Sequence, residues 1–216
     1  GSAYAIIDGI DGRSHHVQFP DIEATGDCRP GAIVELRHFE DRKGRARTAL
    51  AVRSDMDLQS QISAPGATWL DRRNLSRGND DLGGGFGAEV GRAMEERAEH
   101  LASEGLARRQ GQRIIFARNL LDTLKGRELD AAARRLSAEI GIPYNPSQSG
   151  EYVMGTVRQR LNLASGRYAM IDNGLGFALV PWSPSLDKQL GQHISGVMRG
   201  DGGVDWSFGR GRGLGL

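Results

Sequence analysis

Arginine is the residue type in this sequence with the clearest chemistry, because its planar guanidinium group can hold a phosphate through paired hydrogen bonds. Nearly all of the positive charge is arginine, since the lysines are only Lys43, Lys125 and Lys188. The arginines that we single out as DNA-binding candidates fall in three short stretches, and they are Arg108, Arg109, Arg113, Arg118, Arg158, Arg160, Arg210 and Arg212. Their type and grouping suit contacts to a phosphate backbone.

The net charge of the chain, unlike its arginine content, gives no support for nucleic-acid binding. The formal net charge is only +1, and surface arginines usually just remain solvated. Arginine, glycine and alanine are all plentiful here, as they are in proteins from GC-rich genomes. The DNA-binding hypothesis therefore depends on local patches of charge.

Tryptophan offers a second kind of contact to nucleic acid. Trp69, Trp182 and Trp206 could stack on bases if they lay on a barrel surface. The competing interpretation is that they fill the core of small barrels, as tryptophans usually do.

The other chemistry-bearing residues predict neither catalysis nor a metal site in this segment. His15 and His16 are adjacent on a predicted strand, so they point to opposite faces, and no Cys/His set has zinc spacing. There is no Gly-x-Ser-x-Gly motif, and the glycine-rich residues 83–87 lack a P-loop lysine. No metal-binding triad accompanies the tyrosines, which are Tyr4, Tyr144, Tyr152 and Tyr168. We expect no catalytic residue, no metal and no cofactor.

The elements that would position the arginines begin with strands. Residues 4–10 and 14–19 read as two strands joined at Asp11-Gly12, and residues 32–39 and 45–53 read as a second pair. Four or five short strands with glycine turns predict a small SH3-like or OB-like β-barrel over residues 3–54. Residues 55–85 would be a connector that carries the block Ala-Thr-Trp-Leu-Asp.

Residues 86–150 predict a helical module. Apolar residues recur every three or four positions from Phe86 to Leu101, and the helix should stop near Gly105. Residues 106–116 then predict a basic hairpin, and residues 121–140 a second helix that could break at Gly126. A helix, a hairpin and a helix resemble part of a winged-helix module, with Arg108, Arg109 and Arg113 on the wing and Arg118 just beyond it.

Residues 151–208 return to strands and predict a second small barrel. Strand alternation would put Arg158 and Arg160 on one face. The segment 168–172, Tyr-Ala-Met-Ile-Asp, repeats residues 4–8, Tyr-Ala-Ile-Ile-Asp, which supports two related β-modules, although two hairpins can match by chance. Residues 209–216 would form a flexible Gly/Arg tail.

The predicted fold class is therefore α+β, with two small SH3-like or OB-like barrel modules flanking a helical, winged-helix-like middle. The chain has 216 residues, and no apolar run is long enough to cross a membrane, so we expect no membrane insertion. The single cysteine, Cys28, excludes an internal disulfide and fits a reducing cytoplasm. Gly1-Ser2 is typical of a cloning scar, so we expect the chain to be part of a longer protein.

Several blocks resemble the C-terminal region of conjugative relaxases, or mobilization nucleases, of the rhizobial and Ti-plasmid type. They occur in family order, cover nearly the whole chain, and lie at residues 3–37, 66–72, 85–90, 105–109, 163–172, 179–184 and 204–213. Residues 54–66 are shorter than in many such relaxases, which indicates a compact variant or a deletion.

The resemblance implies a bacterial DNA-processing protein, located in the cytoplasm and able to pass with DNA into a recipient cell. Such a relaxase nicks a plasmid at its transfer origin and stays on the DNA end through a tyrosine. The tyrosine and a histidine triad belong to an N-terminal domain that this sequence lacks, so no catalytic residue is carried over. The segment that resembles this chain is described in the family only as a domain of unknown function.

Three hypotheses follow. The first is a noncatalytic accessory region that binds single-stranded DNA or the transfer-origin duplex near the nick. The second is a docking module or secretion signal that the type IV coupling protein recognises, with the arginine-bearing tail as its fitting feature. The third, a hidden hydrolase or nuclease, is disfavoured because no acid–base or metal constellation is present.

Overall fold

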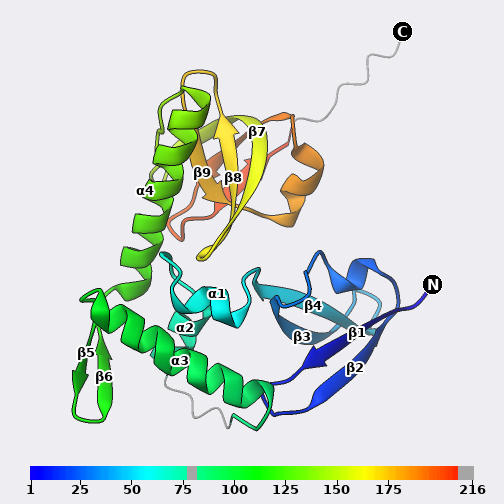
Figure 1. Cartoon of the computed structure of the whole chain (residues 1–216). Helices are drawn as coiled ribbons and strands as arrows, with labels where there is room; N and C mark the ends of the chain where they lie inside the picture. The colour runs from blue at the N-terminus through cyan, green and yellow to red at the C-terminus, as the bar shows by residue number, and fades with distance from the viewer. Residues whose placement is uncertain (77–81, 209–216) are drawn as a thin grey trace. The chain divides into compact units, whose positions relative to one another are not determined.

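The computed structural model describes residues 1–76 and 82–208 of the chain (Figure 1). Its helices and antiparallel sheets confirm the predicted α+β class. The chain divides into two compact units, residues 1–126 and residues 127–216.

The first unit begins with two β-hairpins. Strand β1 (Ala3–Asp8) pairs with β2 (Ser14–Phe19) around a turn in which Gly12 has φ 83°, and β3 (Ile33–Glu40) pairs with β4 (Ala46–Ser54). A short 3-10 helix, η1 (Glu23–Thr25), lies between the hairpins in the sequence. Each hairpin forms its own two-stranded sheet, so the barrel predicted over residues 3–54 does not close. The turns specify local pairing, whereas closure needs pairing between strands of different hairpins.

The helical part confirms the predicted order of helix, hairpin and helix. Helices α1 (Leu58–Ile62) and α2 (Trp69–Leu75) precede the long α3 (Phe86–Ser103). Strands β5 (Ala107–Gln110) and β6 (Arg113–Phe116) form the hairpin, and α4 (Leu120–Ile140) follows. Helix α4 runs through Gly126 without the break that the sequence allowed, because one exposed glycine costs a helix only about 1 kcal/mol.

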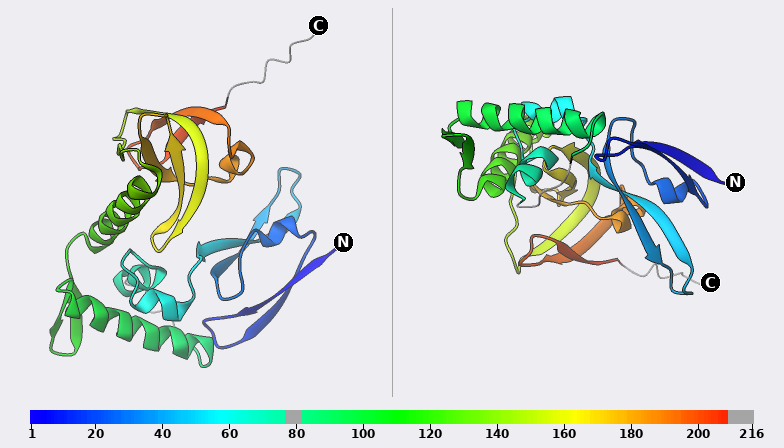
Figure 2. Two further views of the ribbon diagram at one scale, coloured as in Figure 1. Left: turned by 45° about the horizontal axis from the view of Figure 1, so that its top comes forward. Right: turned by 90° about the horizontal axis from the view of Figure 1, so that it is seen from below.

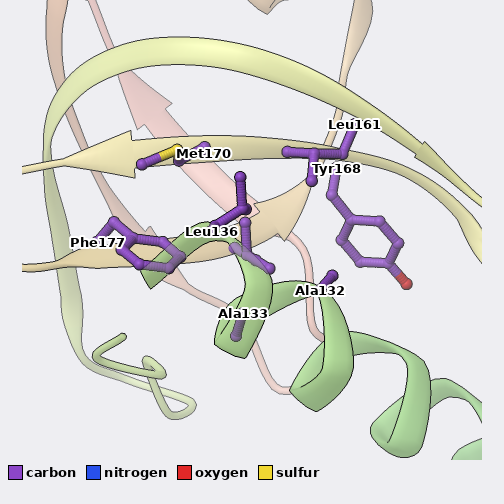
Figure 3. Close-up of a cluster of buried hydrophobic side chains, with 8 residues drawn as sticks. Ala132, Ala133, Leu136, Leu161, Tyr168, Met170 and Phe177 are labelled. Atoms are coloured by element: carbon purple, nitrogen blue, oxygen red, sulfur yellow. The ribbon is translucent and has the colours of Figure 1, made fainter. Parts of the chain in front are cut away.

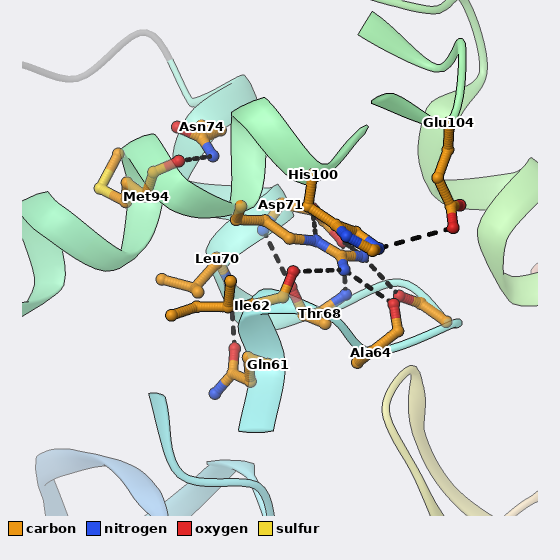
Figure 4. Close-up of polar contacts among 12 residues, drawn as sticks. Gln61, Ile62, Ala64, Thr68, Leu70, Asp71, Asn74, Met94, His100 and Glu104 are labelled. Atoms are coloured by element: carbon orange, nitrogen blue, oxygen red, sulfur yellow. Dashed lines mark hydrogen bonds and ion pairs between the residues drawn. The ribbon is translucent and has the colours of Figure 1, made fainter. Parts of the chain in front are cut away.

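A buried ion pair joins α2 to α3. Asp71 and Arg97 are both 0% exposed, and the guanidinium donates to both carboxylate oxygens at 2.8 and 3.0 Å. Arg97 also donates to three backbone carbonyls of the chain before α2, those of Ile62, Ala64 and Gly66. Thr68 and Asp71 cap the start of α2 reciprocally, and Figure 4 shows this part of the network. The Ala-Thr-Trp-Leu-Asp block thus has a structural role: it builds a cap and a buried anion for α3.

The second unit is built on a five-stranded antiparallel sheet with the order β11-β10-β7-β8-β9. Its elements are β7 (Tyr152–Leu163), β8 (Gly166–Asp172), β9 (Phe177–Pro181), the 3-10 helix η2 (Pro184–Gln189), β10 (His193–Met198) and β11 (Val204–Ser207). The end strands β11 and β9 do not pair with each other, so no closed barrel forms here either. Instead, residues 143–145 hydrogen-bond to Phe177 at the β9 edge.

Both faces of this sheet are covered by apolar side chains. On one face, Leu136 of α4 lies against Tyr168, Met170 and Phe177, together with neighbouring alanines of the helix (Figure 3). On the other face, Leu186 of η2 is fully buried in a second cluster. This accounts for the buried pattern of β8, in which alternate residues serve opposite clusters.

The repeated sequence segments occupy the same kind of element in different surroundings. Residues 4–8 lie in β1 and residues 168–172 in β8, each the first strand of a hairpin. However, Tyr4 is 56% exposed while Tyr168 is 4% exposed, because β1 sits in a two-stranded sheet and β8 in the middle of the five-stranded one. The similarity therefore extends to the hairpin and not to the packing around it.

Candidate nucleic-acid interface

The candidate site is the β5–β6 hairpin, which joins α3 to α4 and extends away from the helices (Figures 1 and 2). Its register pairs Arg108 with Ile115, Arg109 with Ile114 and Gln110 with Arg113. Directly paired residues share a face, and successive residues alternate between faces. Arg108, Gln110, Arg113 and Ile115 therefore form one face, which we call the outer face.

The opposite face of the hairpin is directed to the protein. Ala107 and Phe116 pack against a cluster made of Leu101, Leu106, Leu120 and Leu124, with Ala67. Arg109 lies on this face near the hairpin tip and forms an ion pair with Glu99 of α3. The predicted wing is thus divided: Arg109 is paired within the protein, while Arg108 and Arg113 point the other way.

All residues of the outer face are exposed, including Ile115, whose exposed fraction is 39%. Within the described residues, neither Arg108 nor Arg113 forms a hydrogen bond or ion pair through its guanidinium group. Two unpaired cations, an amide and an apolar side chain can bind phosphate oxygens and pack on the sugar or base between them. The same four side chains offer no general base, nucleophile or metal ligand.

Arg118 lies near this surface but not on the hairpin. It is exposed in the turn between β6 and α4, next to Asn119, which adopts a left-handed conformation with φ 58°. Asn119 O accepts a hydrogen bond from Thr123 N in the first turn of the helix. The turn thus fixes the backbone beside Arg118, and in the described part of the chain its side chain has no ion-pair partner.

The predicted shared face of Arg158 and Arg160 is wrong. The pairing of β7 with β8 shifts between Val157 and Gln159, and this β-bulge reverses the alternation. Arg158 pairs with Asp172, on the side of the sheet that Met170 occupies, at 2.8 Å. Arg160 lies over the Trp182 ring at 5.7 Å, on the side of the second cluster. The two arginines do not form one patch.

The tryptophans pack rather than present free ring faces. Trp182 and Trp206 are partly buried against the second cluster of the five-stranded sheet. Trp69 is the first residue of α2, and the Arg73 guanidinium lies 5.1 Å from its ring centroid. This arrangement agrees with the core interpretation better than with base stacking.

The carboxyl group of Asp172 is held by Arg158 and by the turn that follows β8. Gly174 N donates to Asp172 Oδ1 at 2.7 Å, and Arg158 donates to Oδ2. These bonds, the backbone one first, hold the pKa of Asp172 below its ordinary value of 3.8. Asp172 is thus the last residue of β8, and its carboxylate joins the turn that follows to Arg158 of β7.

Arg210 and Arg212 lie outside the described residues. Among residues 1–76 and 82–208, no group of three or more His, Cys, Asp or Glu side chains could hold a metal ion. No helix of the described chain is long and apolar enough to cross a membrane. The sequence interpretation overlooked Gln110 and Ile115, although alternation along β5 and β6 would have placed both beside Arg108 and Arg113.

A family model described as "Protein of unknown function (DUF3363)" matches residues 36–215, and the chain belongs to this family. The match includes the β5–β6 hairpin and the whole five-stranded sheet, and it begins within β3. Neither the curated proteins nor the solved structures give a match to the chain.

Proposed function

We propose that this DUF3363 member is the noncatalytic accessory region of a conjugative relaxase and contacts DNA through the outer face of its β5–β6 hairpin. The relaxase part of the proposal rests on the sequence blocks that resemble that family. The DNA part rests on one observation: Arg108 and Arg113 lie diagonally across the hairpin on one exposed face and have no carboxylate partner in the described chain.

Local charge supports this more than the net charge does. Residues 105–121 contain four arginines and no Asp or Glu. Glu99 of α3, which forms an ion pair with the hairpin, is engaged by Arg109. A protein with a net charge of +1 can still present a locally positive surface, because charges farther away than about one Debye length, roughly 8–10 Å at physiological salt, are largely screened.

The arrangement favours contacts to the DNA backbone over base readout. Arginines on a short hairpin can each neutralise one phosphate, and such contacts position a protein without reading sequence. The order α3, β5, β6, α4 fits a winged-helix-like module in which the hairpin acts as the wing. The segment itself would not be an enzyme; the nicking tyrosine would lie elsewhere in the relaxase.

The test compares two variants of one hairpin. In Arg108→Ala/Arg113→Ala both outer-face cations are removed; in the matched control, Arg109→Ala, an equal side chain is removed from the protein-facing side. Affinity for labelled single-stranded and duplex DNA is measured by fluorescence anisotropy between 50 and 200 mM salt. Each lost phosphate contact should lower the slope of log K against log salt by about 0.7–0.9.

We expect the double variant to lose about 1.4–1.8 units of slope and the control to keep the wild-type slope. Thermal unfolding of each variant checks that the fold is retained, which exposed substitutions should allow. Equal slopes for wild type and the double variant would refute the hairpin interface. Absence of salt-sensitive binding by the wild type would refute DNA binding itself and leave docking to the coupling protein as the hypothesis to pursue.

A further inference from the structure

A groove of about 840 Å³ lies between the two N-terminal hairpins of the first unit. Its lining includes consecutive residues of β1, 4–8, and of β3 and its approach, 28–36, whereas β2 contributes only His15. Strand β4 contributes Leu50 and Arg53, and the helices contribute Trp69, Arg73 and Phe86. A strand that faces a groove with one side would contribute every second residue. Consecutive lining residues mean that each strand presents its backbone edge to the groove.

The hydrogen-bond pattern shows which backbone groups of β1 point into it. Gly9 N donates to Arg13 O at 2.7 Å, so this pair is hydrogen-bonded, and the bonded pairs recur at every second residue. Residues 3, 5 and 7 therefore bond to β2. The N–H and C=O groups of Tyr4, Ile6 and Asp8 point away from β2, toward the groove.

The same reasoning applies to β3. Asp41 N donates to Arg45 O at 2.9 Å, and residues 39, 37 and 35 continue the bonded pairs with β4. Val34 and Leu36 then direct their backbone groups to the groove. Across the described chain, none of these outward groups in β1 or β3 is hydrogen-bonded to another residue. Two unpaired strand edges thus line one groove, and unpaired edges are templates for a further strand.

Side chains around the groove indicate what kind of strand fits. Tyr4, Ile6 and Ile22 are large apolar residues that are 56%, 78% and 70% exposed. Glu35 is paired with Arg53, but Arg29 is exposed and has no ion-pair partner in the described residues. The groove therefore offers apolar surface, the positive charge of Arg29 and the exposed carboxylate of Asp8, which accepts a hydrogen bond from Ser14 Oγ.

We propose that this groove binds an extended peptide segment of a partner protein, which inserts as a strand between β1 and β3. The segment would carry apolar side chains at alternate positions and an acidic residue that pairs with Arg29. Backbone amides that alternate donor and acceptor along an edge match another polypeptide backbone, and they do not match the acceptor-only phosphates of DNA. Binding of this kind would join the two hairpins into one continuous sheet, β2-β1-peptide-β3-β4. It is independent of the DNA contacts proposed for the β5–β6 hairpin.

The probe is a synthetic library of eight-residue peptides, with alternating Val and Thr as the common core and Glu or Lys at either end. We expect Glu-bearing peptides to bind more tightly than Lys-bearing ones. Bound peptide should slow amide hydrogen exchange at Tyr4, Ile6, Asp8, Val34 and Leu36, the residues whose N–H groups are otherwise open. The proposal would be overturned if no peptide bound. It would also be overturned if bound peptide slowed exchange only at amides other than these five.

Proline variants test the backbone edge directly. Ile6→Pro removes an outward N–H without removing a ladder bond to β2, and Ile6→Thr is the matched control that keeps the N–H. Ile6→Pro should weaken peptide binding about tenfold relative to Ile6→Thr. Leu36→Pro does the same on β3 and serves if Ile6→Pro fails to fold. Unchanged affinity in a folded proline variant would refute the peptide site. A wild-type dimer that binds no peptide and dissociates in the proline variant would also refute it, because the strand edge would then pair with a second copy of the chain.

Discussion

Replacement of Arg97 by methionine tests whether the buried ion pair is what holds α2 against α3. Methionine keeps an unbranched side chain of similar length at the same helical position, so the substitution mainly removes the charge and the donors. Asp71 would then remain as a carboxylate with no exposed surface, in contact with Thr68 N but without a counter-charge. A buried charge without its partner is among the few single changes that destabilise a fold severely.

The magnitude follows from the five hydrogen bonds that Arg97 donates. Two go to Asp71, and three go to the carbonyls of Ile62, Ala64 and Gly66 at 3.1, 2.7 and 2.9 Å. Removal of one member of a buried ion pair costs about 3–5 kcal/mol, before any cost of the freed carbonyls. A domain is stable by only about 5–15 kcal/mol, so the variant should lose a large part of the free energy of unfolding of the first unit.

Urea unfolding, combined with amide hydrogen exchange read by mass spectrometry, measures this loss and locates it. Exchange should accelerate in peptides from α1, α2 and α3 and stay unchanged in the five-stranded sheet of the second unit. Arg92→Met is the matched control, because Arg92 is exposed on the same helix, and it should change stability by no more than about 0.5 kcal/mol. The double variant Arg97→Met/Asp71→Leu should be less destabilised than the sum of the single variants, since neither charge is then left alone.

A loss below about 1 kcal/mol for Arg97→Met would contradict the reasoning, because it would mean that water or a rearranged side chain replaces the guanidinium. Strict additivity in the double variant would also contradict it, since two residues that interact directly must show a coupling energy.

Two further predictions concern the second unit. Because the pKa of Asp172 is lowered, its ionised form stabilises the fold at pH values above the ordinary pKa of 3.8, and this stability is lost as the pH falls through the pKa of the folded state. The variant Asp172→Asn, which also weakens the pair with Arg158, should therefore flatten the dependence of the urea midpoint on pH below about 5. Glu128 is 7% exposed and accepts hydrogen bonds from Ser165 N and Oγ at 3.0 and 2.7 Å. Glu128→Ala should lower the free energy of unfolding by at least about 2 kcal/mol and speed amide exchange at Ser165. The control Glu139→Ala, on the exposed side of α4, should change that free energy by no more than about 0.5 kcal/mol. Exchange at Ser165 as slow as in the wild type would show that Glu128 does not anchor α4 to the β7–β8 turn.

Local signals in the sequence predicted the elements well. The Asp11-Gly12 and Gly111 turns specified hairpins, and the apolar spacing from Phe86 to Leu101 specified α3, because each depends on residues close together in the chain. The pairing between hairpins was not predicted correctly, since closure of a barrel depends on contacts between distant strands that a single sequence does not reveal. The ion pair of Asp71 and Arg97 was missed for the same reason: an arginine on a charged helix reads as solvated until its position relative to α2 is known.

Arginines that look alike in the sequence differ in whether their guanidinium groups are available to bind a phosphate. Arg109 is committed to Glu99, Arg158 to Asp172 and Arg160 to the Trp182 ring, so each of these side chains would have to exchange an existing contact for a phosphate. Arg108 and Arg113 have no such contact to give up within the described chain, and they share a face because β5 and β6 are paired in register. A strand alternation read without its partner strand cannot make this distinction, and a bulge such as that at residues 157–159 even reverses it. The hairpin is therefore the part of the molecule where a test of DNA binding is most informative, because Arg108 and Arg113 are exposed there and have no ion-pair partner in the described residues.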